Sequence, residues 1–496
     1  MYFPTLQQAR ELLDKGEYRR IPVSREILSD FTSPIQVLRI LRNVSHHCFL
    51  LESAEDSQRW GRFTFLGFHP ALEVTCANGT VRFRAGKHCR EDERVEMTKH
   101  PGTFLRELLS RYKSPELPEL PPFTGGLVGY FSYDYVKYAE PSLTLDANDT
   151  EGFHDMDFML FDKVIAFDHY RQRLIFIVSA DAENLEESYA EACRELDSLV
   201  DLIRYGQAAK DAPGKLISPF RPLFGEAEYC AMVERAKDYI LEGDIFQVVL
   251  SNRLEADYEG SLLNAYRILR ASNPSPYMFY FSSDDMELTG ASPETLVKLQ
   301  NGILHTFPLA GTRPRGATPE EDAALERELL SDEKELAEHN MLVDLGRNDL
   351  GKISEFGSVE VEKYLQVERF SHVMHIGSTV KGRIRSDCDA ADAVDAILPA
   401  GTLSGAPKLR AMEIINELEN NKRGVYGGAI GYLDFAGNLD TCIAIRLAFK
   451  KNGKVFIRSG AGIVADSVPE REYQECANKA KAVIEALRIA EGDETL

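Results

Sequence analysis

The segment from Phe307 to Arg315 combines groups that could hold an anion. It reads Phe-Pro-Leu-Ala-Gly-Thr-Arg-Pro-Arg, and so contains one hydroxyl, two guanidinium groups and two prolines that restrict the backbone. We expect a loop that binds an anionic ligand. Ala310, directly before Gly311, offers no amine that could attack or deprotonate that ligand, and this omission narrows the possible reactions.

Two glutamates occupy positions where the helical period calls for apolar residues. Glu338 does so in an expected helix over 333–347, and Glu475 in an expected helix over 469–489. Their apolar neighbours on the same face are Met341, Leu342 and Leu345 in the first helix, and Ala482, Ala486 and Ile489 in the second. Either acid alone would be interpreted as a residue of a solvated helix edge or as a salt-bridged structural acid. Two inward carboxylates together favour a shared hard cation such as Mg²⁺, which prefers oxygen ligands and keeps several waters.

Several other polar groups lie next to glycines or within apolar runs. The segment 401–408 differs from a phosphate-binding loop in its lysine position, and we expect a turn feeding a helix, where Thr402 either faces an anion or only caps the helix. Gly460 to Gly462 predicts a turn after a strand that lets a ligand approach the backbone. Arg446 lies in an apolar run, so we expect a buried guanidinium paired with a carboxylate of the protein or, preferably, of a substrate. His375 could be an acid or base, or a packing residue.

The elements that must position these groups change in character along the chain. Short apolar runs separated by turns predict a sheet-rich region up to about residue 180, followed by an acidic helix over 182–203 and a Gly- and Pro-containing linker over 205–215. We therefore divide the chain into regions 1–215 and 216–496. The second region mixes helices and strands without a strand-helix alternation, which indicates an α+β fold and disfavours Rossmann and TIM architectures.

The overall composition excludes several functional classes. The chain has 496 residues with 57 basic against 79 acidic side chains, a net charge of −22. This balance argues against binding to nucleic acid or to an anionic membrane surface. The eight cysteines form no CxxC pair, and no apolar run is long enough to span a membrane. We expect an intracellular, cytoplasmic protein.

Taken together, these motifs resemble those of the chorismate-utilising enzymes, and most closely the large subunits of the branch that makes anthranilate. The resemblance spans nearly the whole chain. It is carried by Gly243-Asp-Ile-Phe-Gln-Val-Val-Leu-Ser251, Ala291-Ser-Pro-Glu-Thr295, Pro308-Leu-Ala-Gly-Thr-Arg-Pro-Arg315, Ala337-Glu-His-Asn-Met-Leu-Val-Asp-Leu345, Gly401-Thr-Leu-Ser-Gly-Ala-Pro-Lys408 and Gly460-Ala-Gly462. The fold it implies has antiparallel β-sheets packed as a sandwich with flanking helices. Region 216–496 would bind chorismate, and region 1–215 would carry elements of tryptophan regulation.

The resemblance also implies roles for individual residues. Glu338 and Glu475 correspond to the Mg²⁺ ligands, which agrees with the two inward acids. The implied chorismate contacts are Gly311, Thr312, Tyr426, Arg446, Gly460, Ala461 and Gly462. Glu294 corresponds to an acid near the departing 4-hydroxyl, His375 to a residue of the later elimination, and Thr402 to a polar contact. The implied tryptophan contacts are Ser53, Pro276, Tyr277 and Met278.

The positions of amines separate the branches of this family. Relatives that add water carry a lysine where this chain has Gln247, and aminodeoxychorismate synthases typically carry one at the position of Ala310. Gln247 favours ammonia over water as the nucleophile, and the two residues together favour the anthranilate branch, with anthranilate and pyruvate as products. The resemblance implies a separate glutamine amidotransferase subunit as ammonia donor, in an assembly of two large and two small subunits. The alternatives are an aminodeoxychorismate synthase large subunit and a non-catalytic regulator of the same fold.

Overall fold

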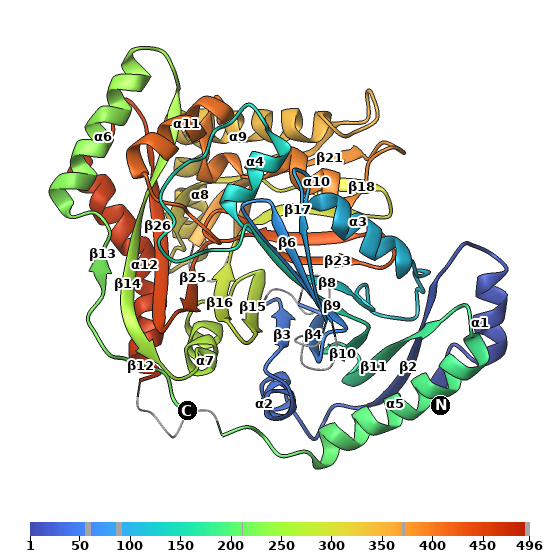
Figure 1. Cartoon of the computed structure of the whole chain (residues 1–496). Helices are drawn as coiled ribbons and strands as arrows, with labels where there is room; N and C mark the ends of the chain where they lie inside the picture. The colour runs from blue at the N-terminus through green and yellow to red at the C-terminus, as the bar shows by residue number, and fades with distance from the viewer. Residues whose placement is uncertain (55–60, 86–91, 211, 370–372, 492–496) are drawn as a thin grey trace.

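The computed structural model describes residues 1–54, 61–85, 92–210, 212–369 and 373–491. Within them, two large sheets face each other and helices cover their outer surfaces (Figure 1). Every ladder in both sheets is antiparallel in the described residues. The expected α+β sandwich with flanking helices is therefore confirmed.

The first sheet has fourteen strands in the described part of the chain. Its strands in spatial order are β1 (Tyr2–Phe3), β2 (Arg20–Leu28), β11 (Arg173–Asp181), β10 (Lys163–Asp168), β4 (Phe63–Phe68), β3 (Cys48–Glu52), β15 (Tyr277–Ser282), β16 (Met286–Ser292), β25 (Leu447–Lys451), β26 (Lys454–Ile463), β14 (Gln247–Glu259) and β12 (Lys215–Leu216), with β13 (Arg221–Pro222) and β22 (Gly405–Ala406) also paired to β14.

The second sheet has twelve strands among the described residues. Their order is β19 (Leu309–Pro314), β21 (Val373–Arg383), β18 (Ile303–Thr306), β17 (Thr295–Gln300), β24 (Leu439–Ile443), β23 (Ala429–Asp434), β8 (Gly126–Phe131), β9 (Met156–Phe161), β5 (Leu72–Ala77), β6 (Thr80–Ala85) and β7 (Asp92–Met97), with β20 (Glu360–Arg369) paired to β21. Each sheet takes strands from both sides of residue 215, so the linker divides the sequence but not the sheets.

Helices form on the outer surfaces because their apolar stripes pack against the sheets. They are α1 (Leu6–Leu13), α2 (Pro34–Val44), α3 (Gly102–Arg111), α4 (Val136–Ala139), α5 (Leu185–Tyr205), α6 (Glu226–Leu241), α7 (Leu263–Ser272), α8 (Pro319–Ser331), α9 (Glu333–Gly351), α10 (Ala390–Ile397), α11 (Lys408–Glu419) and α12 (Pro469–Ile489), with 3₁₀ turns η1 (Tyr133–Tyr135) and η2 (Gly401–Leu403). None of the helices in the described ranges combines the length and apolar character needed to cross a membrane.

The core between the two sheets is rich in aromatic residues. Phe49 from β3 and Phe161 from β9 meet edge to face with ring centroids 4.7 Å apart, and Phe279 and Ile430 belong to the same buried cluster. Alternate residues of each strand point into this layer, while the opposite faces pack against helices such as α5 and α10. This core holds the two sheets together, and it thereby fixes the segments in which the chain crosses from one sheet to the other.

Candidate functional site

Two neighbouring crossovers between the sheets place Glu294 and Arg446 together. The chain leaves the first sheet after β16 and enters the second at β17, with Glu294 in between, and it returns between β24 and β25 through Arg446. The crossovers are bonded to each other, because Ile443 N donates to the Glu294 carbonyl at 2.9 Å and Ala291 N donates to the Arg446 carbonyl at 3.1 Å. Glu294 and Arg446 therefore project from two crossovers that are hydrogen-bonded to each other.

The carboxyl group of Glu294 is largely withdrawn from water. Burial raises its pKa to about 7, although a hydrogen bond from Thr402 and the charge of Arg446 oppose this rise. The Thr402 hydroxyl, on η2, donates to Glu294 Oε1 at 3.3 Å. Near neutral pH the group is thus divided between its acid and base forms, as a proton-transfer residue requires.

Arg446 differs from the sequence prediction. The apolar run around it is not one buried strand but two strands in different sheets, and Arg446 lies at the break with a left-handed φ of 52°. Its residue surface is exposed, although desolvation by the surrounding protein lowers the pKa of the guanidinium and Glu294 opposes this. The guanidinium is therefore exposed at the crossover rather than enclosed in the core.

The edge of the second sheet forms another wall of the site. His375 on β21 lies beside β19, where its Nδ1 is 2.8 Å from the Gly311 carbonyl and 3.1 Å from the Thr312 hydroxyl. A carbonyl can only accept, so we assign a proton to Nδ1. Burial lowers the pKa of His375, which keeps the imidazole neutral near pH 7.

The segment from Phe307 to Arg315 is not the predicted loop. Residues 309–314 form the edge strand β19, which has an irregular register at Gly311. Arg313 is 2.9 Å from Asp332 and Arg315 is 2.9 Å from Asp322, so carboxylates of the protein engage both guanidinium groups. Gly311 has φ of 67°, and a Cβ there would lie 3.1 Å from Glu335 Oε2. This wall is shaped by its glycine and not by its arginines.

Gly460, Ala461 and Gly462 also differ in conformation from the prediction, because they lie inside β26 rather than in a turn. A Cβ at Gly460 would come within 2.8 Å of the Tyr426 hydroxyl, and one at Gly462 within 2.7 Å of Gln247 Nε2. These close neighbours belong to the protein, so the approach of a ligand to this backbone stays a prediction. The strand thereby brings Tyr426 and Gln247 to the same surface.

Glu338 on α9 and Glu475 on α12 face a common acidic region, but neither lies in a buried stripe. The buried side of α12 includes Ala486, as predicted, together with Cys476, Ala480, Val483 and Leu487. Glu475 lies outside it, and its side chain is 50% exposed. Glu338 is half-buried beside the buried stripe of α9. Burial raises the pKa of Glu338, and the charges of Glu335 and Glu475 add to this rise.

Lys479 connects the acidic region to Glu294. Its ammonium group lies 2.8 Å from Glu475 Oε1 and donates to the Gly460 carbonyl at 3.1 Å. It also lowers the pKa of both Glu294 and Glu338 through its charge. The predicted metal ligands and the predicted acid therefore belong to one electrostatic unit.

The acidic region suits a hard cation by its donor chemistry. Glu338 forms no ion pair within the described residues, and Glu472 has a pKa raised by burial and by Glu475. Facing carboxylates with raised pKa values are stabilised by a divalent cation with oxygen ligands. The described ranges hold no group of three or more His, Cys, Asp or Glu side chains placed to bind a metal, so a cation here would complete its shell with water and ligand oxygens.

A cavity lies between β3, β15 and the β23–β24 pair, and Arg446 is not among its lining residues. Its volume is about 220 Å³, and its lining includes all four predicted inhibitor contacts, Ser53, Pro276, Tyr277 and Met278. The Tyr277 hydroxyl lies 2.9 Å from Thr295 Oγ1 and donates to Asp440 at 2.8 Å. Thr295 directly follows Glu294, so the cavity wall is bonded to the crossover that carries the acid.

Three residues of the site carry no distinctive sequence signal. Glu335 and Glu472 each precede a predicted ligand by three residues, and Lys479 follows Glu475 by four. These spacings place each pair on one side of a helix. They are equally typical of solvated helix surfaces, however, and only the meeting of α9, α12 and β26 gives them a common location.

The chain is similar over most of its length to known enzymes that bind chorismate. Residues 46–485 match the family model described as chorismate binding enzyme. The chain is 45% identical to anthranilate synthase component 1 of Acetivibrio thermocellus, over 99% of each chain, and 45% identical to that of Pseudomonas aeruginosa, over 96% of each. Anthranilate synthase component I of Streptococcus pneumoniae superposes with a TM-score of 0.75 at 42% identity, over 85% of this chain and 92% of that one. The menaquinone-specific isochorismate synthase of Escherichia coli, at 19% identity and a TM-score of 0.68 over 97% of this chain and 98% of that one, shares the fold.

Proposed function

The chain belongs to the chorismate-binding enzyme family, and on that premise we propose that it is the large subunit of an anthranilate synthase. It converts chorismate and ammonia to anthranilate and pyruvate, the first committed step of tryptophan biosynthesis. The observation that carries this proposal is a site with Glu294 beside Arg446 but with Gln247 and Ala310 at the two positions that distinguish the family branches. Turnover of chorismate with ammonium tests it.

The positive and polar groups of the site match the two carboxylates of chorismate. Arg446, exposed at the crossover, binds the enolpyruvyl carboxylate. Tyr426 and the strand from Gly460 to Gly462 form a close wall for the ring, with Gly311 and Thr312 opposite. None of these groups is a primary amine. The attacking amine therefore has to come from solution or from a partner.

Proton transfers fall to Glu294 and His375. With a pKa raised to about 7 by burial, Glu294 can donate a proton to the departing 4-hydroxyl at neutral pH. His375, neutral and with Nδ1 directed at the Gly311 carbonyl, can accept a proton in the later elimination that releases pyruvate. Thr402 orients the Glu294 carboxyl group.

Glu338 and Glu475 hold Mg²⁺ in this proposal. Bound there, the cation would neutralise the ring carboxylate of chorismate and the charge that develops as the 4-hydroxyl departs. The two glutamates come from different helices, so the site forms only in the folded chain. Lys479 balances their charge and keeps Glu475 directed towards β26.

Ammonia is supplied by a second protein in our proposal. Glutamine hydrolysis uses an activated cysteine nucleophile, and burial raises the pKa of Cys76, Cys442 and Cys476 here, which disfavours the thiolate. We therefore expect a glutamine amidotransferase small subunit, in an assembly of two large and two small subunits in the cytoplasm.

Tryptophan inhibits the enzyme from the cavity of about 220 Å³. We expect Ser53→Phe to abolish inhibition, because the larger ring occupies the cavity that Ser53 and Met278 line. Turnover without tryptophan should stay within about 2-fold of the wild type, since neither Glu294 nor Arg446 lines this cavity. Initial rates of anthranilate formation are measured over a tryptophan titration of both chains. Inhibition of the variant at wild-type tryptophan concentrations would remove this cavity from the regulatory role.

A further inference from the structure

A buried charged cluster lies directly behind the candidate chorismate site. Glu419, at the end of α11, is 2% exposed and contacts two guanidinium groups, Arg423 at 2.5 Å and Arg458 at 2.8 Å. Burial alone would raise the pKa of Glu419, but the two arginines lower it below its ordinary value. Ser251 N also donates to the carboxylate, at 2.7 Å. The cluster is therefore ionised and closely bonded.

Arg423 extends from this cluster to the walls of the site. Its Nη1 donates to the Leu403 carbonyl at 2.7 Å, on the residue after Thr402, and its Nη2 donates to the Val249 carbonyl at 2.7 Å, on β14. The guanidinium also lies over the ring of Tyr426, 5.8 Å from its centroid. One side chain thus joins η2, β14 and Tyr426.

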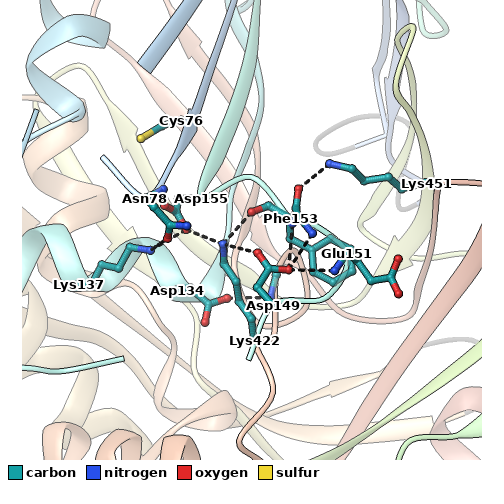
Figure 2. A network of polar contacts seen from close by, with 12 residues as sticks. Cys76, Asn78, Asp134, Lys137, Asp149, Glu151, Phe153, Asp155, Lys422 and Lys451 are labelled. Carbon is teal, nitrogen blue, oxygen red and sulfur yellow. Dashed lines mark hydrogen bonds and ion pairs between the residues drawn. The ribbon is translucent and has the colours of Figure 1, made fainter. Parts of the chain in front are cut away.

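The segment that carries Arg423 is fixed from its other side. Figure 2 shows Lys422 directed into a separate polar network, where its Nζ donates to the Phe153 carbonyl at 2.7 Å and lies 3.0 Å from Asp155. Asp149 is also within ion-pair distance, at 3.2 Å. Because Lys422 and Arg423 are each held by several buried contacts with different partners, we infer that Arg423 is a fixed point for η2.

We propose that Arg423, held by Glu419, is a positioning residue that fixes η2 so that the Thr402 hydroxyl keeps Glu294 in its reactive orientation. This inference rests on the proposed function. Arg423 is buried behind the wall and contacts no substrate, so its effect passes through Thr402. Lysine is a discriminating replacement, because it keeps the positive charge beside Glu419 but lacks the planar fork that reaches both carbonyl groups.

The test begins with Arg423→Lys. We expect kcat for anthranilate formation with ammonium to fall about 10-fold, which is part of the effect of a positioned acid. The KM for chorismate should change by less than about 3-fold, because Arg446, Glu338 and Glu475 lie on other walls of the site. A weaker Thr402 bond raises the pKa of Glu294 further, so the basic limb of the rate profile moves to higher pH. Arg62→Lys is the matched control, since Arg62 holds the buried Asp168 at 2.7 Å in a different region and should leave kcat and the profile unchanged.

A double variant distinguishes positioning from general loss of structure. If Arg423 acts through Thr402, then Arg423→Lys combined with Thr402→Val has the kcat of Thr402→Val alone. The inference would be overturned if the two substitutions lower kcat by the product of their separate effects, or if a folded Arg423→Lys has the wild-type kcat and pH profile. Either result would leave the proposed function intact. If Arg423→Lys does not fold, Glu419→Gln is assayed in the same cycle with the same criteria. A wild-type chain that forms no anthranilate would refute the proposed function and the inference together.

Discussion

Replacing Glu475 with alanine is expected to abolish Mg²⁺-dependent turnover of chorismate in a chain that stays folded. The Glu475 side chain is 50% exposed and its ion pair with Lys479 lies within one helix, so its contribution to stability is at most about 1 kcal/mol. Its carboxylate nevertheless faces Glu338 from the opposite helix. Loss of several kcal/mol of charge stabilisation predicts a rate at least about 100-fold lower.

The measurement is anthranilate formation over a Mg²⁺ titration, together with Mg²⁺ binding by calorimetry. Glu338→Ala should give the same loss, and Glu485→Ala on the exposed surface of α12 is the control that should retain both activity and Mg²⁺ dependence. Wild-type turnover and an unchanged Mg²⁺ requirement in Glu475→Ala would refute the assignment of this pair as the metal ligands.

Glu294→Gln is expected to lower kcat about 10²- to 10⁴-fold, the range for loss of a positioned general acid. The acid form of Glu294 is the active one in this proposal, and its fraction falls as the pH rises through the pKa of about 7. The wild-type rate should therefore decline on the basic side of neutrality, and the residual rate of the glutamine variant should lack this limb.

The same substitution separates catalysis from stability. A carboxyl group whose pKa is raised on folding contributes stability at low pH that is lost as the pH rises through about 7. Glu294→Gln cannot ionise, so relative to the wild type it should gain thermal stability between pH 5 and pH 8, measured as the change in Tm across that interval. A rate profile identical in shape to that of the wild type would exclude Glu294 as the titrating acid.

Periodic segments of the sequence predicted their structures well. The acidic helix expected over 182–203 is α5, and the last helix spans 469–489 as predicted. These elements have strong amphipathic patterns, and their burial against the sheets requires no information from distant parts of the chain. The sheet-rich region expected up to about residue 180 is likewise present, and it includes β3, β5 and β8.

Predictions about side-chain environment were less successful, for a topological reason. The apolar run around Arg446 looks like one strand, but it crosses from one sheet to the other, so the arginine at the crossover is exposed instead of buried. Glu475 shares a helix side with alanines, yet the buried stripe of α12 passes through the adjacent Cys476. One residue of rotation turns a helix by about 100°, which short alanine patterns cannot resolve.

The site itself arises from contacts between distant segments. Glu294, Thr402 and Lys479 come from a crossover, a 3₁₀ turn and the last helix, and no local spacing relates them. Arg313 and Arg315 show the converse, since their sequence suggests anion binding but the acids of neighbouring helices already engage them. Charge in a sequence therefore indicates a ligand only where the fold supplies no partner.

The most direct test of the account is the fate of chorismate with the purified chain, Mg²⁺ and ammonium. Fluorescence follows anthranilate, a coupled reduction follows pyruvate, and chromatography follows any intermediate. We predict anthranilate and pyruvate in equal amounts, with no glutamine amidotransferase subunit required when ammonium replaces glutamine. Accumulation of aminodeoxychorismate, or chorismate left unchanged under these conditions, would contradict the account.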